Sequence, residues 1–381
     1  MARARSFAVD PRVADLRDDP ARVHALRDAL TSWFVDARRD LPWRRTDDAY
    51  AIWISEAMLQ QTRVEAVLGH YARFLERFPT VRDLAAADED EVVGMWSGLG
   101  YYNRARTLRR AALAIVDEHG GEFPDTEAEA RALPGVGDYT TGAVLSIAYG
   151  RGLALVDGNV ARVFARLFAI REPIDGGPVK RTLWELARIL VPDDHPDRNA
   201  RTAPGTWNQA LMELGALVCA PRSPRCEECP LHDPCKARAQ GVAEALPTKR
   251  PKRKPVDVHL EVLLARRGDE VLVVRRPADD RMARMWELPT RELLTDDSDE
   301  THLWPRTPHG PSGLVEPRPG SHLGTLAHGI THHRIRATLR AAEVDEHVLD
   351  ATDPDSARWI PVADCEDLSL TGLSRKALRQ T

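Results

Sequence analysis

Lysine is missing from the first 179 residues of this 381-residue chain, in which Lys180 is the first one. Nearly half of the chain therefore lacks the side-chain amine that Schiff-base chemistry needs. Long apolar stretches are missing too: we find no run of about 18 apolar residues that could span a membrane. The N-terminus, MARARSFAVDPRV, also lacks the apolar stretch of a secretory signal. We expect a cytoplasmic protein without a membrane span.

An excess of positive charge is absent as well. The chain has 53 Lys and Arg against 58 Asp and Glu, for a formal net charge of -5. Bulk charge thus gives no support for nucleic-acid binding, so a DNA-binding surface would have to be local. At 381 residues with 43% hydrophobic residues, the chain is long enough for two or three domains with ordinary cores.

Apolar residues recur at helical spacing in WISEAMLQQ, ERFPTVRDLAAA and VARVFARLFAI, which predicts a series of helices over residues 23–240. Residues 247–255, PTKRPKRKP, hold three prolines and five basic residues, as in a stiff linker. Its charge could contact phosphate or simply face water. The following VDVHLEVLLARRGDEVLVVRR reads as two strands joined by a Gly-Asp turn. We therefore expect an α+β domain after the linker.

Four of the five cysteines lie close together, with the spacing C-x6-C-x2-C-x5-C. A reducing compartment favours a metal site over disulfides for such a cluster. Four thiolates can hold Zn²⁺ or a [4Fe–4S] cluster. Only one C-x2-C pair is present, whereas zinc sites usually contain two. The spacing therefore favours iron–sulfur, with zinc as the alternative, at Cys219, Cys226, Cys229 and Cys235.

The segment Leu133–Gly137, LPGVG, lies between two predicted helices. Gly135 and Gly137 allow positive φ and the close approach of another backbone. A helix beginning near Asp138 would point free N–H groups into the turn, which suits a phosphate. Many helix pairs use such a turn for structure alone, so the motif by itself does not decide between the two.

Two carboxylates are predicted to lie in different surroundings. Glu56 shares a helix face with Ile52, Trp53 and Leu59, where desolvation should raise its pKa and retain a proton, as a general acid requires. Asp157 precedes a helix and can cap it, which favours the ionised form. A partly exposed helix glutamate and a plain N-cap are the alternatives. In the first interpretation, Glu56 and Asp157 form a pair of an acid and an electrostatic stabiliser, which suits the breaking of a glycosidic bond.

The motifs LPWRR, SEAMLQQT, GLGYYNRAR, LPGVGDYTTGA and VDGNV, with the cysteine loop, resemble the adenine DNA glycosylase family of the endonuclease III superfamily. The resemblance covers about residues 40–236. It implies an all-α, two-lobed helix–hairpin–helix core with an iron–sulfur loop, with DNA between the lobes. The domains we expect are this core at 1–236, a basic linker at 237–256 and an α+β Nudix-like domain at 257–381.

The same resemblance implies roles for single residues. Glu56 would protonate adenine and then handle water, Asp157 would stabilise the cationic sugar, and Asn159 would support both. Tyr139 stands where bifunctional relatives carry a lysine, which implies a monofunctional glycosylase. The remaining matches concern the adenine pocket, the base stack and the hairpin turn, although each aromatic could instead be a core residue: Trp43, Arg44, Gln61, Tyr101, Gly135 and Gly137.

The C-terminal part departs from active Nudix hydrolases, which need a glycine-led helix with clustered glutamates for Mg²⁺. Here Met285–Pro289, MWELP, is followed too soon by Arg291–Leu293, and acidic residues are displaced to 296–299. In the family this domain recognises 8-oxoguanine opposite adenine. The matching loop is HGITHH, in which Thr331 and His332 are the candidates; metal binding or plain solvation of these histidines are alternatives.

The expected partner is double-stranded DNA with adenine opposite 8-oxoguanine or guanine, bound by a monomer. A thymine or pyrimidine glycosylase is one competing hypothesis, which SEAMLQQT and the extra domain oppose. A non-catalytic DNA-binding iron–sulfur protein is a second, which the two carboxylates oppose. A nucleotide pyrophosphatase is a third, which the displaced acidic residues oppose.

Overall fold

A computed structural model describes residues 10–250, 254–277, 282, 284–293, 317–344, 355–366 and 368–381. The chain forms two compact units. The first contains residues 1–87 and 107–251, and the second contains residues 88–106 and 252–381. No helix in the described ranges is both long and apolar enough to cross a membrane.

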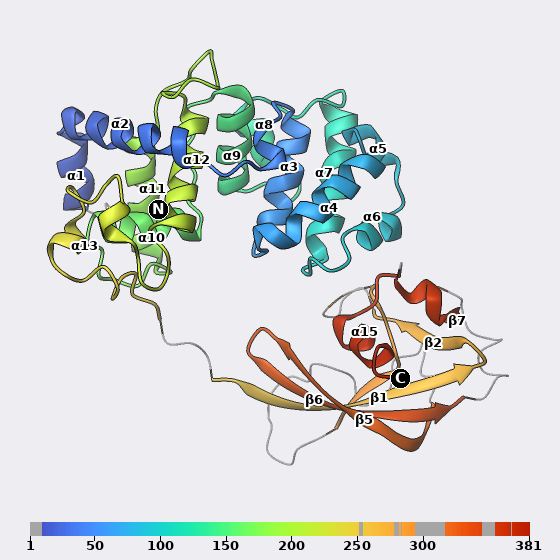
Figure 1. The fold of residues 1–381 in the computed structure, drawn as a ribbon. Coiled ribbons are helices and arrows are strands. Elements are labelled where there is room, and N and C mark those ends of the chain that lie inside the picture. The colour runs from blue at the N-terminus through green and yellow to red at the C-terminus, as the bar shows by residue number, and fades with distance from the viewer. Residues whose placement is uncertain are drawn as a thin grey trace, which may run out of the picture. The chain divides into compact units, whose positions relative to one another are not determined.

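The chain is helical from α1 to α13, which includes the residues 23–240 over which the apolar spacing predicts helices (Figure 1). Its elements are α1 (Pro11–Arg17), α2 (Pro20–Ala37), η1 (Pro42–Arg44), α3 (Ala49–Leu59), α4 (Val64–Arg77), α5 (Val81–Ala86), α6 (Glu89–Met95), α7 (Asn103–Glu118), α8 (Glu127–Ala132), α9 (Asp138–Tyr149), α10 (Gly158–Leu167), α11 (Gly177–Leu190), α12 (Pro204–Leu217), η2 (Cys226–Glu228) and α13 (Lys236–Ala239).

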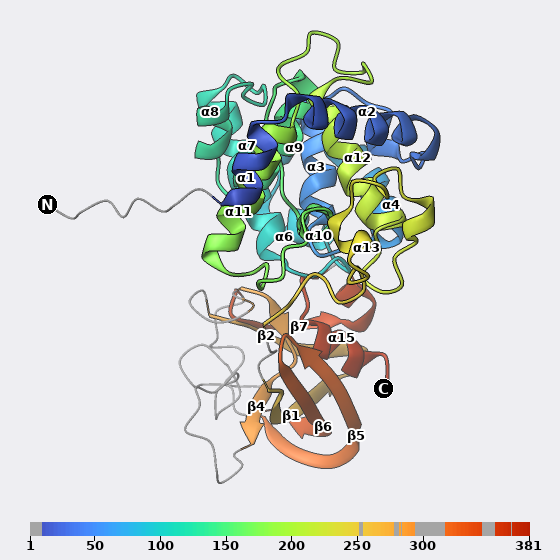
Figure 2. The ribbon, with the colours of Figure 1, turned by 90° about the vertical axis from the view of Figure 1, so that its left-hand side faces the viewer.

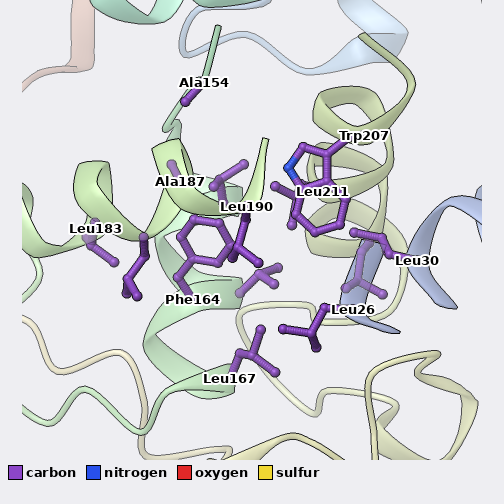
Figure 3. Packing of buried hydrophobic residues seen from close by; sticks show 14 of the residues in the cluster. Leu26, Leu30, Ala154, Phe164, Leu167, Leu183, Ala187, Leu190, Trp207 and Leu211 are labelled. Atoms are coloured by element: carbon purple, nitrogen blue, oxygen red, sulfur yellow. The ribbon is translucent and has the colours of Figure 1, made fainter. Parts of the chain in front are cut away.

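One group of helices joins the two ends of the helical sequence. α1 lies beside α11, and α2 packs on α12, so residues 11–37 complete a core built by residues 158–217 (Figure 2). Phe164 of α10 is buried at its centre, with Leu190 on one side and Trp207 and Leu211 on another (Figure 3). This core holds α10 in place from all sides.

A second group is built around α3, which is buried from Ala49 to Met58 and packs on α4 and α9. α9 also contacts α12 and so joins the two groups. Gly142 in α9 is required by the segment that leads into α10, because a Cβ there would lie 2.0 Å from the Ala154 carbonyl oxygen.

One local pattern differs in detail from expectation. ERFPTVRDLAAA is not one helix, because α4 ends at Arg77 and α5 begins at Val81, with a Thr80–Asp83 capping box between them. Thr126 caps α8, and its side chain accepts a hydrogen bond from the Glu129 N–H. Pro79 supplies the physical reason for the break in the first case, since proline disfavours a helical residue before it.

The second unit contains a mixed sheet with the strand order β3-β2-β1-β6-β5, in which β4 also pairs with β1 and β7 with β2 (Figure 1). β1 and β6 run parallel and the other pairs run antiparallel. The strands are β1 (Val256–Arg267), β2 (Glu270–Arg275), β3 (Trp286–Glu287), β4 (Thr290–Leu293), β5 (Arg318–Ile330), β6 (His333–Glu343) and β7 (Ala357–Pro361), followed by η4 (Val362–Glu366) and α15 (Gly372–Leu378).

The predicted Gly-Asp hairpin is confirmed: Arg267 pairs with Glu270, and Gly268 has a φ of +62°. One face of the sheet carries an apolar core on which Leu373 and Ala377 of α15 pack. Residues 290–293 form strand β4 directly after the MWELP segment. The helix that a Nudix hydrolase needs does not begin there, whereas residues 296–299 lie outside the described residues.

The segment after α13 is more closely attached to the helical unit than a solvated linker would be. Leu246 is buried, and its carbonyl accepts a hydrogen bond from Arg166 Nε at 2.9 Å. The Ile174 N–H donates to the Thr248 carbonyl, and Arg250 pairs with Asp175. The chain therefore belongs to the folded helical unit at least as far as residue 250.

We expect Gly142→Ala to lower the free energy of unfolding by about 1–3 kcal/mol, because the added methyl overlaps the Ala154 carbonyl. Gly69→Ala is the matched control, since Gly69 lies inside α4 with open space around the position of a Cβ, and helix propensity should make it neutral or stabilising. Denaturant unfolding of both variants checks this. Equal stabilities would contradict the packing described.

Candidate active site

A cavity of about 200 Å³ lies in the helical unit, between α3, α9, the start of α10 and α12. The structure brings together there six of the residues singled out from the sequence: Trp43, Arg44, Glu56, Tyr139, Asp157 and Asn159. They come from segments far apart in the chain, since Glu56 and Tyr139 are separated by 83 residues, so folding rather than proximity in sequence assembles the site.

Glu56 lies on the buried part of α3 and is 5% exposed. Ile52 and Leu59 line the cavity beside it as expected, but Trp53 packs on Tyr50 and Phe123 instead. Burial raises the pKa of Glu56 to about 7; the hydrogen bond from Tyr139 opposes the rise, and the negative charge of Asp157 adds to it. The carboxyl can therefore hold a proton near neutral pH.

Tyr139, in the first turn of α9, holds one oxygen of Glu56 in place. Its hydroxyl donates to Glu56 Oε2 at 2.5 Å, and it also lies 3.4 Å from Met212 Sδ. Burial and the two neighbouring carboxylates raise the pKa of Tyr139 well above its ordinary value. The phenol thus stays protonated and donates, which leaves the other oxygen of Glu56 to carry the acidic proton.

Asp157 caps α10 as the sequence predicts. Oδ1 accepts from the Val160 N–H at 2.7 Å, and Oδ2 accepts from Asn159 Nδ2 at 2.9 Å. The cap hydrogen bonds favour the ionised form as expected, but burial, which the sequence did not reveal, raises the pKa of Asp157 by more than these bonds lower it. Two donors nevertheless favour its anionic form, whereas Glu56 has one.

The sequence reasoning missed Glu213 on α12, which is 1% exposed and lines the same cavity. Arg39 and Arg44 both bind its carboxylate through paired hydrogen bonds of 2.7–3.0 Å. Burial alone raises the pKa of Glu213, but the two arginines outweigh it and lower the pKa to about 2. The available signal was a glutamate on an otherwise apolar helix face, as for Glu56.

Asn159 is held by a second arginine system. Arg162 Nη2 donates to Asn159 Oδ1 at 2.8 Å and to the Gly215 carbonyl at 2.7 Å, while Nε donates to the Cys219 carbonyl at 2.8 Å. A Cβ at Gly215 would lie 2.6 Å from that of Asn159, so glycine is required for α12 to approach so closely. The cysteine loop and the start of α10 are therefore directly connected.

The four clustered cysteines line one small cavity of about 30 Å³, together with Arg166 and His232. Within the described ranges, no three His, Cys, Asp or Glu side chains are grouped as ligands of one metal ion would be. Four thiols around a common hollow are the donor set that a multi-iron cluster takes. Cys365 lies apart, buried in the second unit.

The hairpin turn between α8 and α9 has the predicted position. Gly135 has a φ of +74°, and a Cβ there would meet Thr107 Cγ2 at 2.2 Å. Gly137 differs from expectation, because its φ of −99° is open to any residue. As the N-cap of α9 it has open space where a Cβ would stand, so a ligand can approach the helix N-terminus there.

Gln61 and Tyr101 do not line the cavity. Both adopt left-handed backbone angles, with φ of 59° at Gln61 and 50° at Tyr101, which are uncommon for residues with a side chain. Tyr101 is 56% exposed, which is unusual for a large aromatic. Strain of this kind is concentrated at functional positions.

Thr331 and His332 form the two-residue turn between β5 and β6, where Ile330 pairs with His333. The Thr331 side chain is exposed and that of His332 is half-buried, and Thr331 has a φ of 54°. The His332 ring stacks on that of His333 at 4.0 Å. The predicted loop is thus the tip of a long hairpin in the second unit.

Comparison with known proteins identifies the two parts of the chain. Residues 54–189 match the HhH-GPD superfamily of base excision DNA repair proteins, and residues 261–380 match the NUDIX domain. A structure of a thermostable thymine-DNA glycosylase is 31% identical, covers 58% of this chain and 98% of its own, and has a TM-score of 0.50. The fold of the helical part is therefore that of a DNA glycosylase.

Proteins related over most of their length decide which family this is. The adenine DNA glycosylase of Homo sapiens is 34% identical over 95% of this chain and 74% of its own length. That of Rattus norvegicus is also 34% identical, over 96% of this chain and 79% of its own. The cavity with its buried glutamate and capped aspartate thus lies in a chain that belongs to the family of adenine-specific DNA N-glycosylases.

Proposed function

We propose that this protein removes adenine paired with 8-oxoguanine or guanine, acting as a monomer that does not cut the DNA strand. The observation that carries the proposal is the buried Glu56, which has a pKa of about 7 and lines the same cavity as Asp157, the N-cap of α10. A base can be removed only after it leaves the helix stack, and this cavity can receive it.

The reaction needs a proton on the departing base. Protonated Glu56 supplies it, because Tyr139 occupies one carboxyl oxygen and leaves the other free to donate. Once Glu56 has given its proton to the base, its carboxylate can accept a proton from a water molecule. The oxygen of that water then adds to the sugar. A group with a pKa near the working pH serves both steps.

The sugar becomes cationic as the bond breaks. Ionised Asp157 stabilises that charge, and the hydrogen bonds from Val160 and Asn159 hold its carboxylate in position beforehand. Strand cleavage through a covalent adduct would need an amine at the position that Tyr139 occupies. A phenol cannot form a Schiff base. The enzyme therefore releases the base alone.

DNA reaches the site through groups outside the cavity. We assign phosphate binding to the turn at Gly135 and Gly137 and the N-terminus of α9. Gln61 and Tyr101, with their strained backbones, are proposed to enter the base stack and extrude the adenine, while Trp43 and Arg44 form the pocket wall.

The cysteine loop fits a [4Fe–4S] cluster held by Cys219, Cys226, Cys229 and Cys235. The arrangement of their side chains around one hollow supports it, and zinc would need the four sulfurs around a single point. Such a cluster fixes the fold of the loop. Through Arg162 this loop also braces Asn159 and hence Asp157.

The domains we propose are the glycosylase core at 1–236, the segment 237–256 and the Nudix-like domain at 257–381. The last of these is proposed to read the opposite base with Thr331 and His332. Pyrophosphatase activity is disfavoured, because Arg276 holds the carboxylate of Glu287 in a buried ion pair of 2.9 Å and strand β4 follows it.

We expect Glu56→Gln to slow single-turnover excision by at least about a hundredfold, since general acid catalysis contributes ~10²–10⁴-fold. Binding of the same duplex should persist, because the amide preserves the shape of the side chain. The excision rate is measured by a quenched single-turnover assay and the binding affinity by gel-shift titration, both on duplexes with adenine opposite 8-oxoguanine. A variant that retains its rate would exclude Glu56 as the acid.

The dependence of the excision rate on pH should reflect the ionisation of Glu56. A general acid works while protonated, so the rate should fall as pH rises through about 7, the pKa of Glu56. Tyr139→Phe removes the hydrogen bond that lowers this pKa, and the alkaline limb should therefore move to higher pH. Tyr149→Phe, whose hydroxyl bonds the Phe123 carbonyl, is the control and should leave the profile in place. A limb that moves to lower pH in Tyr139→Phe would refute the assignment.

A chain ending at Arg250 should still excise adenine, because the cavity and its supports lie before that residue. Its preference for 8-oxoguanine over guanine should shrink by about ten- to a hundredfold, since a base contact contributes ~1–3 kcal/mol. Thr331→Ala combined with His332→Ala in the full chain should reduce the preference for 8-oxoguanine by part of that amount. An unchanged preference would show that the helical unit reads the lesion alone.

A further inference from the structure

Arg166 is a buried cation in an unusual environment. It lies on α10, one turn after Arg162, and is 2% exposed. No carboxylate among the described residues forms an ion pair with it, although a buried charge without a counter-charge is costly. Its hydrogen bonds go instead to the carbonyls of Cys219 at 3.0 Å, Ala220 at 2.8 Å and Leu246 at 2.9 Å.

The same guanidinium also contacts a sulfur atom: Arg166 Nη1 lies 3.2 Å from Cys219 Sγ, within hydrogen-bonding distance. Arg166 lines the cavity shared by the four cysteines. Four thiolates around an iron–sulfur core carry net negative charge, which supplies the counter-charge that the protein itself does not. Arg166 thus places a positive charge and a side-chain N–H donor beside the sulfur of Cys219, whereas Cys229 receives a backbone hydrogen bond from Leu231.

We propose that Arg166 sets the reduction potential of the cluster by donating a hydrogen bond to Cys219 Sγ. This inference rests on the cofactor proposed above. Each one-electron reduction, with the electron taken from an external donor or an electrode, adds negative charge beside the guanidinium. Hydrogen bonds to the sulfurs and net charge are established determinants of such potentials. Arg166 therefore favours the more reduced member of each couple.

Arg238 offers a matched control in the same loop. It lines the same cavity, but its side chain is 35% exposed and pairs with Glu227, which is 83% exposed. Its charge is screened by solvent, and no hydrogen bond to sulfur involves it within the described part of the chain. Loss of Arg238 therefore changes charge near the loop without removing a donor to a ligand.

The test is electrochemical titration of the full-length, iron-loaded protein as wild type, Arg166→Gln, Arg166→Lys and Arg238→Gln. Arg166→Gln should lower the equilibrium constant for one-electron reduction at least about tenfold, a shift of about 59 mV to more negative potential. Arg166→Lys should shift it less, and Arg238→Gln least. Equal potentials in Arg166→Gln and wild type, or an equal shift in Arg238→Gln, would overturn the proposal.

If Arg166→Gln does not retain iron, wild-type protein with ¹⁵N-labelled arginine answers the question. Pulsed paramagnetic resonance of its cluster should detect one coupled arginine nitrogen, and the lack of such coupling would refute the hydrogen bond. Wild-type protein without iron and sulfide would instead reject the proposed cofactor. Iron-loaded, active protein with unchanged potentials would reject only the role of Arg166.

Discussion

The burial of two arginines on α10 is the constraint on which the helical unit depends. Arg162 and Arg166 lie one turn apart on a helix buried from Val160 to Leu167. A buried guanidinium must place its donors, and these two bind carbonyls at Gly215, Cys219 and Leu246. Those bonds fix α10 against rotation about its axis and translation along it. They thereby also fix the position of Asp157 at its N-cap. The geometry of Asp157, the proposed stabiliser of the sugar, is therefore determined partly by the cysteine loop, whose Cys219 lies 57 residues after Arg162.

Burial raises the pKa of both Glu56 and Asp157, two of the three carboxyls that line the cavity, and the number of hydrogen-bond donors distinguishes these two. Glu56 receives one donor and Asp157 two. Arg44 lowers the pKa of Glu56 but also binds Glu213 through two hydrogen bonds, so its charge is largely matched before it acts on Glu56. Without Glu213, the charge of Arg44 would favour ionised Glu56 and remove the proton that the proposed mechanism requires. Glu213 therefore belongs to the chemistry of the site although it donates nothing itself.

Local sequence patterns were sufficient for features that local geometry determines. The glutamate on an apolar helix face, the aspartate before α10, the turn at Gly135 and the hairpin at Gly268 all lie where spacing placed them. Features that depend on tertiary contacts were not predictable. Trp53 packs away from Glu56, and Arg162 meets a carbonyl 57 residues distant. The pKa of Asp157 was misjudged because capping is visible in sequence, whereas the depth of burial is not.

The absence of lysine from the first 179 residues now has a structural counterpart. Arginines there are used as multiple donors inside the fold: Arg27 binds three carbonyls at the end of α11, and Arg39 and Arg44 enclose one carboxylate. A planar guanidinium can satisfy several acceptors at once, which an ammonium group cannot do as rigidly. Cations used in this way are not available to DNA phosphates. We therefore propose that DNA binding by a chain with net charge -5 depends on the backbone N–H groups assigned above to the hairpin turn and on the side chains proposed to enter the base stack, rather than on counterion release alone.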